Sequence, residues 1–261
     1  MSQAGIAGGG AVSSSPTAAA QSPTSTSERP ATPTPQSGRV IAIDPGHGGD
    51  ELGVVHYGAD GRIDLIEKDV NLSVAQRLAS LLEKEGYRPV LIRQSDRAVN
   101  LPARDLNGDG QVNGDDDLQA RIDVANAAGA ELLLSIHHNG ADPSVRGTST
   151  WYCADRPFGS QNRRLAELVQ SSLLKQLKAA GYADVVDMGA NDDPPLEKPF
   201  GHLFLVGSKT PRVARPSSMP GVVGEPLFVT NDREAKLLAE DSVQLHIARG
   251  YLESVRAFFG E

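Results

Sequence analysis

The chain has 261 residues, enough for one α/β domain and a tail, and carries 25 basic and 33 acidic side chains. The resulting net charge of −8 provides no basic face for phosphates, so we expect no nucleic-acid partner. No apolar run approaches the roughly 20 residues that cross a bilayer, and no signal-peptide pattern is visible. The single cysteine, Cys153, excludes an intramolecular disulfide and is most simply a small packed residue.

The first 38 residues differ in composition from the rest of the chain. They are almost wholly Ala, Ser, Thr, Gly, Pro and Gln. Such a segment has too little apolar surface to offset the entropy lost on ordering. We therefore predict a disordered linker at residues 1–38 and one folded domain at residues 39–261.

Short apolar runs alternate with helical patterns from Arg39 onward. The predicted strands cover residues 40–43, 88–92, 132–136 and 147–152, and the predicted helices cover residues 67–86, 117–129, 165–181 and 238–259. Residues 187–220 are rich in Pro, Gly and charge, which favours a loop. This alternation predicts an α/β fold: a single domain with a mixed, mostly parallel sheet flanked by helices on both faces.

Four chemically capable side chains stand at the ends of these elements. His47 lies in the glycine-rich segment 44–49, directly after the first apolar strand. His137 follows the strand at residues 132–136, Glu225 follows Val222-Val223-Gly224, and Glu67 begins a helical pattern. Because sites in open α/β sheets gather beyond the carboxyl ends of strands, these groups could converge at one sheet edge.

Two imidazoles and one carboxylate, with a fourth position left for water, are typical of hydrolytic zinc sites. A second carboxylate can then accept the proton of the attacking water. Each residue also has a simpler interpretation. His47 and His137 could be hydrogen-bonded loop residues, Glu67 a helix N-terminal acid favoured by the macrodipole, and Glu225 an ion-paired loop residue. His138 could compete as a ligand, whereas His56, His202 and His246 fit structural or surface roles.

The four segments also carry a family resemblance, which extends from Arg39 to the C-terminus. Ile43–Gly49, Glu67–Leu72, Ser135–Asn139 and Glu225–Asn231 resemble, in that order, the motifs of the zinc-dependent N-acetylmuramoyl-L-alanine amidases of type 3. The resemblance implies that His47, Glu67 and His137 bind zinc, that Glu225 is catalytic and that Arg121 supports the site. It further implies peptidoglycan as substrate and an extracytoplasmic location, and it leaves the oligomeric state open.

Two alternatives remain beside this expectation. Gly224 and Pro226 flank Glu225 where the family tends to have an aliphatic residue and a Thr or Ser. One alternative is a zinc hydrolase of another amide or peptide, and the other is a non-catalytic module that binds peptidoglycan. Digestion of purified peptidoglycan distinguishes the expected amidase from these two alternatives.

An insertion at about residues 100–117 contains a second metal-site pattern. Oxygen-bearing side chains occupy loop positions 1, 3, 5, 9 and 12, with glycine at position 6 and an apolar residue at position 8. The residues expected to form the calcium site are Asp105, Asn107, Asp109, Gln111, Asn113 and Asp116. This is the spacing of an EF-hand loop, and it resembles the calcium loops of dockerin modules. We therefore expect a structural calcium ion here. The alternative is a solvated acidic turn, because Asp, Asn and Gly all favour turns.

Overall fold

The computed structural model describes residues 38–193 and 202–261. The predicted linker therefore lies, apart from Gly38, outside the described residues. Within the described part of the chain, no helix combines the length and apolar character needed to cross a membrane.

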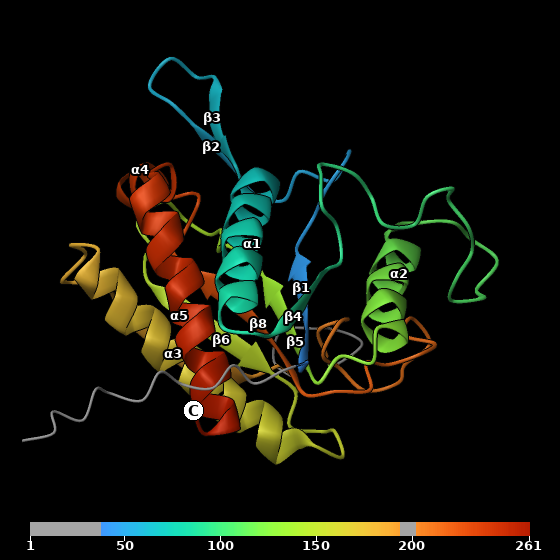
Figure 1. Ribbon diagram of the computed structural model, residues 1–261. Helices are drawn as coiled ribbons and strands as arrows, with labels where there is room; N and C mark the ends of the chain where they lie inside the picture. The colour runs from blue at the N-terminus through green and yellow to red at the C-terminus, as the bar shows by residue number, and fades with distance from the viewer. Residues whose placement is uncertain (1–37, 194–201) are drawn as a thin grey trace, which may run out of the picture. The chain divides into compact units, whose positions relative to one another are not determined.

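Strands and helices alternate along most of the domain (Figure 1). The strands are β1 (Val40–Pro45), β2 (Val55–Tyr57), β3 (Ile63–Ile66), β4 (Arg88–Leu91), β5 (Leu132–Ile136), β6 (Thr148–Tyr152), β7 (Asp187–Asp192) and β8 (Gly221–Pro226). The helices are α1 (Glu67–Lys84), α2 (Gly114–Ala127), α3 (Gly159–Ala179), α4 (Asp232–Leu238) and α5 (Asp241–Phe259).

Six strands form one sheet in the order β4-β1-β5-β8-β6-β7. Every neighbouring pair is parallel except β6 and β8, which run antiparallel. The predicted α/β class with a mixed, mostly parallel sheet is therefore confirmed.

Alternate residues of β1 face two separate apolar layers, as the two-residue period of a strand requires. Ile41 and Ile43 belong to a core that includes buried side chains of α1, α3 and α5. Val40 and Ala42 belong to a second core with Ile122 of α2 and the segment 204–219. In Figure 1, α1, α3 and α5 lie together and α2 lies apart from them. Both faces of the sheet are thus covered.

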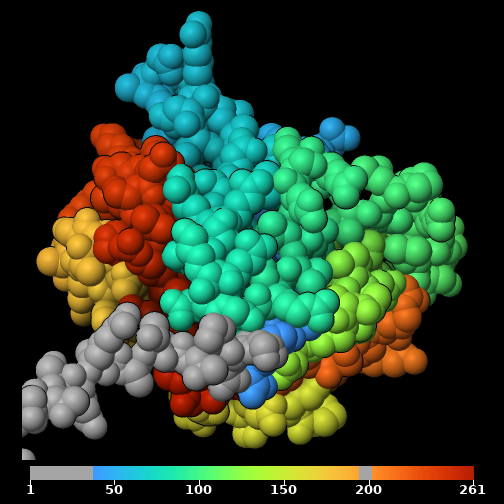
Figure 2. Space-filling model, in the orientation of Figure 1, coloured from blue at the N-terminus to red at the C-terminus, as the bar shows by residue number. Residues whose placement is uncertain are grey.

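Three local features of the structure add detail to the sequence-based expectations. Residues 187–192 form the edge strand β7 by pairing with β6, so the segment 187–220 is not loop throughout. The predicted C-terminal helix at residues 238–259 corresponds to α5, and a separate short helix, α4, precedes it, with its backbone capped by the Asn231 side chain. Residues 55–66, directly before Glu67, form the β2–β3 hairpin, which projects from the rest of the surface in Figure 2.

Candidate metal centre and catalytic site

The register of three parallel strands brings the predicted residues to one sheet edge. Pro45 of β1 is paired with Ile136 of β5, and Ile136 is paired with Gly224 of β8. His47, His137 and Glu225 follow these three positions by two, one and one residue. The backbone N–H of His137 donates to the carbonyl oxygen of Gly224 at 3.0 Å, which fixes His137 beside Glu225.

His47, Glu67 and His137 meet at a single point. His47 Nε2 lies 3.0 Å from Glu67 Oε1 and 3.1 Å from His137 Nδ1, and His137 Nδ1 lies 3.2 Å from Glu67 Oε1. The three donor atoms form a nearly equilateral triangle. Among the described residues, this is one of two groups of His, Cys, Asp or Glu side chains whose donor atoms converge as a metal ion requires.

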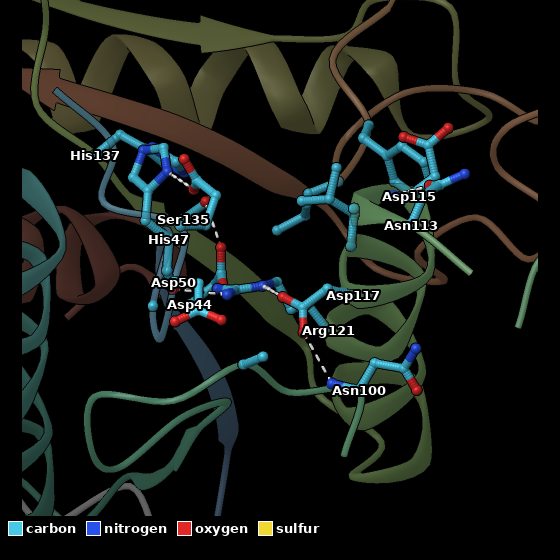
Figure 3. A pocket seen from close by; sticks show the side chains of 18 of the residues that line it. Asp44, His47, Asp50, Asn100, Asn113, Asp115, Asp117, Arg121, Ser135 and His137 are labelled. Carbon is cyan, nitrogen blue, oxygen red and sulfur yellow. Dashed lines mark hydrogen bonds and ion pairs between the residues drawn. The ribbon is translucent and has the colours of Figure 1, made fainter. Parts of the chain in front are cut away.

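A cavity of about 830 Å³ opens beside this triangle. Its wall includes His47, His137 and Glu225, together with the apolar side chains of Leu203 and Leu205. Figure 3 shows the rings of His47 and His137 side by side at this cavity. Two of the three predicted ligands, His47 and His137, and the predicted catalytic acid therefore line one substrate-sized space.

Glu225 is held in place by neutral donors. Its Oε2 atom accepts hydrogen bonds from Trp151 Nε1 at 2.7 Å and from Ser149 Oγ at 3.2 Å. Burial raises the pKa of the Glu225 carboxyl, and this effect outweighs His137 and the two hydrogen bonds, which lower the pKa. A carboxyl group whose pKa lies above its usual range is suited to accept a proton near neutral pH.

The buried Glu67 carboxylate is oriented by its own network of contacts. Its Oε2 atom accepts the backbone N–H of Val54 at 2.8 Å, and its Oε1 atom accepts the backbone N–H of His138 at 3.0 Å. Burial raises the pKa of Glu67, but hydrogen bonds with His137 and His47 dominate and hold the pKa well below its usual range. Glu67 is therefore ionised, as a metal ligand must be.

Glu51 faces the far side of the His47 ring. Its carboxylate pairs with His47 Nδ1, while His47 Nε2 points toward Glu67. A carboxylate on the second ring nitrogen fixes the tautomer and orientation of a ligating histidine. Burial lowers the pKa of His47, but the carboxylates of Glu67 and Glu51 raise it above its usual value overall.

His138, the possible competing ligand, points away from the triangle. Its Nδ1 atom contacts Asn71 Oδ1 at 2.7 Å in the buried layer beneath the site. Burial lowers its pKa to about 4, so the ring is neutral. His138 therefore supports Asn71, whose Nδ2 atom donates to Gly46 and Glu67, and it takes no place in the triangle.

Two buried arginines hold the turn that presents His47. Arg121 donates to Asp44 Oδ1 and to the carbonyl oxygens of Pro45 and His47, as Figure 3 shows in part. Arg93 donates to the carbonyl oxygens of Pro45 and Gly46. The turn needs this support because His47 adopts a left-handed backbone conformation with φ of 64°.

The sequence predicted a supporting role for Arg121 but did not single out Arg93, Glu51 or Ser149. Arg93 carried a usable signal, since it lies two residues beyond β4, the neighbour of β1 in the sheet. Glu51 and Ser149 carried none, because an acid in a glycine-rich loop and a serine in a strand are common without any site.

The predicted calcium loop forms a compact turn before α2. Asp105 accepts backbone N–H groups from Gly108 at 2.7 Å and Gly110 at 2.9 Å. Asp116 accepts from three backbone N–H groups and completes a capping box with Asn113, so α2 begins at Gly114, earlier than expected. Neither convergent donor group of the described residues contains a loop side chain. Calcium binding therefore stays a prediction.

Comparisons with known proteins agree with this geometry. The family model described as N-acetylmuramoyl-L-alanine amidase, type 3, matches residues 41–257. The germination-specific N-acetylmuramoyl-L-alanine amidase of Bacillus subtilis is 29% identical over 229 residues, which cover 87% of this chain and 82% of the relative.

Two solved structures share the fold. The N-acetylmuramoyl-L-alanine amidase from Clostridium difficile 630 has a TM-score of 0.62 and 26% identity, covering 85% of this chain and 97% of that one. The catalytic domain of CwlV from Paenibacillus polymyxa has a TM-score of 0.61, 23% identity and coverage of 85% and 98%, a likeness of fold alone. On the evidence of the family model, which spans nearly the whole folded domain, the chain belongs to the type 3 N-acetylmuramoyl-L-alanine amidases.

Proposed function

We propose that this amidase hydrolyses the bond between the lactyl group of N-acetylmuramic acid and L-alanine in peptidoglycan. In this proposal His47, Glu67 and His137 bind a zinc ion and Glu225 is the general base. The observation that carries it is the triangle of three donor atoms at the wall of a cavity that Glu225 also lines.

The donor set fits zinc in number, type and spacing. Catalytic zinc sites have three protein ligands, and two histidines with one glutamate are an established combination. A tetrahedral ion with bonds of about 2.0–2.1 Å requires donor atoms about 3.3 Å apart. The observed separations of 3.0–3.2 Å are close to this distance, so an ion needs only a small outward movement of the three side chains.

When bound, zinc polarises the scissile carbonyl group and lowers the pKa of the attacking water. Glu225 accepts the proton of that water with the carboxylate oxygen that Trp151 and Ser149 leave unbonded. The same carboxyl then donates this proton to the leaving L-alanine nitrogen. Fixed donors on Oε2 keep the carboxyl oriented through both transfers.

The outer contacts keep the site rigid. Glu51 holds the ring of His47, and the backbone N–H groups of Val54 and His138 hold the Glu67 carboxylate. Ligands that are oriented before the ion binds lose little freedom on binding.

The substrate and the location follow from the family. Peptidoglycan lies outside the cytoplasmic membrane, so we propose an extracytoplasmic enzyme. A negative protein can act on an anionic polymer because the zinc centre is itself positive: two neutral imidazoles and one carboxylate leave one net positive charge on the ion.

We also propose that the loop at residues 105–116 binds a structural calcium ion. Its side-chain oxygens at loop positions 1, 3, 5, 9 and 12 follow EF-hand spacing, and it leads directly into α2, which carries Arg121. An ion here would hold α2, and through Arg121 the turn of His47, in place.

Digestion of purified peptidoglycan by the zinc-loaded protein tests the function. The expected products are stem peptides with a free L-alanine amine, leaving the glycan strands intact. Glu225→Gln is expected to retain zinc and lower kcat by about 10²–10⁴-fold. A cut within the stem peptide would indicate another zinc hydrolase, and binding without turnover a non-catalytic module.

A further inference from the structure

A second group of side chains converges elsewhere in the domain, separate from His47, Glu67 and His137. Cys153 Sγ lies 3.2 Å from His202 Nδ1, and Asp193 Oδ1 lies 2.9 Å from the same nitrogen. We refer to Cys153, Asp193 and His202 as the Cys153 cluster. The donor atoms of all three lie within 4.8 Å of one another, as in the catalytic triangle.

Strand pairing fixes two members of the cluster. Tyr152, the last residue of β6, is paired with Asp192, the last residue of β7. Cys153 and Asp193 are the next residues on these parallel strands, and the backbone N–H of Asp193 donates to the carbonyl oxygen of Tyr152 at 2.8 Å. Both side chains are fully buried, so the surrounding packing fixes the positions of both donor atoms.

The geometry does not suit a nucleophilic thiol. In a Cys-His-Asp triad, the cysteine and the acid contact different nitrogens of the histidine ring. Here the sulfur and the carboxylate oxygen approach the same atom, His202 Nδ1. Burial raises the pKa of Cys153 to about 12, and its side chain has no exposed surface for a substrate. Three donor atoms directed at one point are instead the arrangement expected of a metal-binding site.

We propose that Cys153, Asp193 and His202 bind a second zinc ion, which is structural and distinct from the catalytic one. Thiolate, imidazole and carboxylate are all zinc ligands, and the thiolate selects zinc over calcium or magnesium. Binding releases the Cys153 proton to solvent. One thiolate and one carboxylate then neutralise the two positive charges of the ion, which suits a site at which Cys153 and Asp193 are buried.

Neighbouring groups are arranged as in known zinc sites. Asp155 Oδ2 faces His202 Nε2 at 3.6 Å, so the ring presents Nδ1 to the cluster and its other nitrogen to a carboxylate. The backbone N–H of Asp155 also donates to the sulfur of Cys153 and favours the thiolate. Leu203 donates its backbone N–H to Asp193 Oδ2 at 2.8 Å, which leaves Oδ1 directed at the other two donors.

The site would fasten part of the catalytic cavity. His202 directly precedes Leu203, Phe204 and Leu205, which line that cavity. Residues 202–220 contain no helix or strand, so no regular series of backbone hydrogen bonds holds them in place. A metal ion that joins His202 to the ends of β6 and β7 fixes this wall relative to the sheet.

Cobalt substitution of the full chain tests the proposal without relying on activity. Co²⁺ bound to a thiolate gives a near-ultraviolet charge-transfer band, and the catalytic triangle contains no sulfur. We expect this band in the wild-type protein and in His137→Ala, and we expect none in Cys153→Ser. Metal analysis in excess calcium should find two zinc ions per wild-type chain and one in each variant.

Two results would overturn the proposal. One is a cobalt-loaded wild-type protein without the thiolate band. The other is a set of three zinc contents: one ion per chain in the wild type, one in Cys153→Ser and none in His137→Ala. The wild-type spectrum remains decisive even where Cys153→Ser fails to fold. If only the catalytic triangle binds zinc, the second site is excluded and the proposed hydrolysis is unaffected.

Discussion

The guanidinium of Arg121 donates a 2.6 Å hydrogen bond to the backbone carbonyl of His47, the residue whose ring faces Glu67 and His137. The same guanidinium forms a buried ion pair with Asp44 at 2.9 Å. Through these contacts, α2 holds the turn that follows β1 and thereby sets the direction in which the His47 ring points. The geometry of the proposed metal site therefore depends on a contact that involves none of the proposed ligand atoms.

Arg121→Ala tests this dependence. Removing one partner of a buried ion pair leaves Asp44 unpaired, and we expect the free energy of unfolding to fall by about 3–5 kcal/mol. Zinc affinity should fall with it. Urea denaturation and zinc titration measure the two effects. The matched control is Arg163→Ala, whose solvent-exposed pair with Glu167 on α3 should contribute little to the free energy of unfolding. Equal losses in the two variants would contradict the role of Arg121.

The residues that the sequence predicted share one property: each stands at the boundary of a regular element. His47, His137 and Glu225 follow apolar strands, and Glu67 begins a helix. Parallel strands place such positions at one edge, so the pattern could predict that these side chains converge, whereas the roles proposed for them came from the family resemblance. The sheet order itself depends on long-range pairing, which periodicity does not encode.

Tertiary packing decides the features that the sequence did not indicate. Arg93 acts through four backbone carbonyl oxygens, a role that leaves no pattern in the chain. Cys153 and His202 were interpreted separately, as a packed residue and as a structural or surface residue. Only the pairing of β6 with β7 and the path of residues 202–205 show that they meet.

Gly46 leaves no space for a larger residue. A Cβ atom at this position would lie 2.2 Å from Cε1 and Nε2 of the His137 ring. Gly46→Ala should therefore displace His137 and lower zinc affinity by about 10–100-fold, the range seen when the support of a ligand is lost. Competition with a chelator measures the affinity. Gly114→Ala is the control, because a Cβ there meets nothing within 4 Å. An unchanged affinity in Gly46→Ala would show that His137 is not a ligand.

Trp151→Phe should change the pH dependence of hydrolysis. The indole N–H donates to Glu225 at 2.7 Å and lowers the pKa of that carboxyl, so its removal raises the pKa further. A base with a raised pKa loses its charge at a higher pH, and the acid limb of kcat/KM moves upward. A hydrogen bond to a charged group contributes about 1.5–3 kcal/mol, which corresponds to about one to two pH units.

The matched variant is Ser149→Ala, which removes the longer hydrogen bond of 3.2 Å and should shift the acid limb less. At pH values above the limb, both variants should approach a plateau. An acid limb that neither variant moves would mean that another group titrates in it.

Calcium should stabilise the protein through the loop at residues 105–116. Extracellular modules bind calcium at about 10⁻⁴–10⁻³ M, so 10 mM calcium should add about 1–3 kcal/mol to the free energy of unfolding. Asp105→Ala should abolish this gain, whereas Asp60→Ala, at the exposed hairpin, should retain it. Thermal melts with and without calcium measure the difference. If Asp105→Ala gains as much as the wild type, the ion binds elsewhere.

His56 should make the stability of the β2–β3 hairpin depend on pH. Its Nδ1 atom lies 2.6 Å from Asp64 of β3, and its Nε2 atom lies 3.2 Å from Asp232, the first residue of α4. Only the protonated ring can donate to both carboxylates. Burial lowers the pKa of His56, but the hydrogen bonds to Asp64 and Asp232 raise it above its usual value overall.

A folded-state pKa above the unfolded value of about 6.5 sets the direction of the effect. The stabilisation is fully present below pH 6.5 and is lost as the pH rises through the folded-state pKa. His56→Gln should therefore lower the melting temperature most at about pH 5.5 and least at about pH 9. His246→Gln is the matched control, because His246 Nδ1 contacts the neutral side chain of Gln176 and not a carboxylate. A His56→Gln difference that stays constant, or grows toward high pH, would show that the two carboxylates do not bind a protonated imidazole.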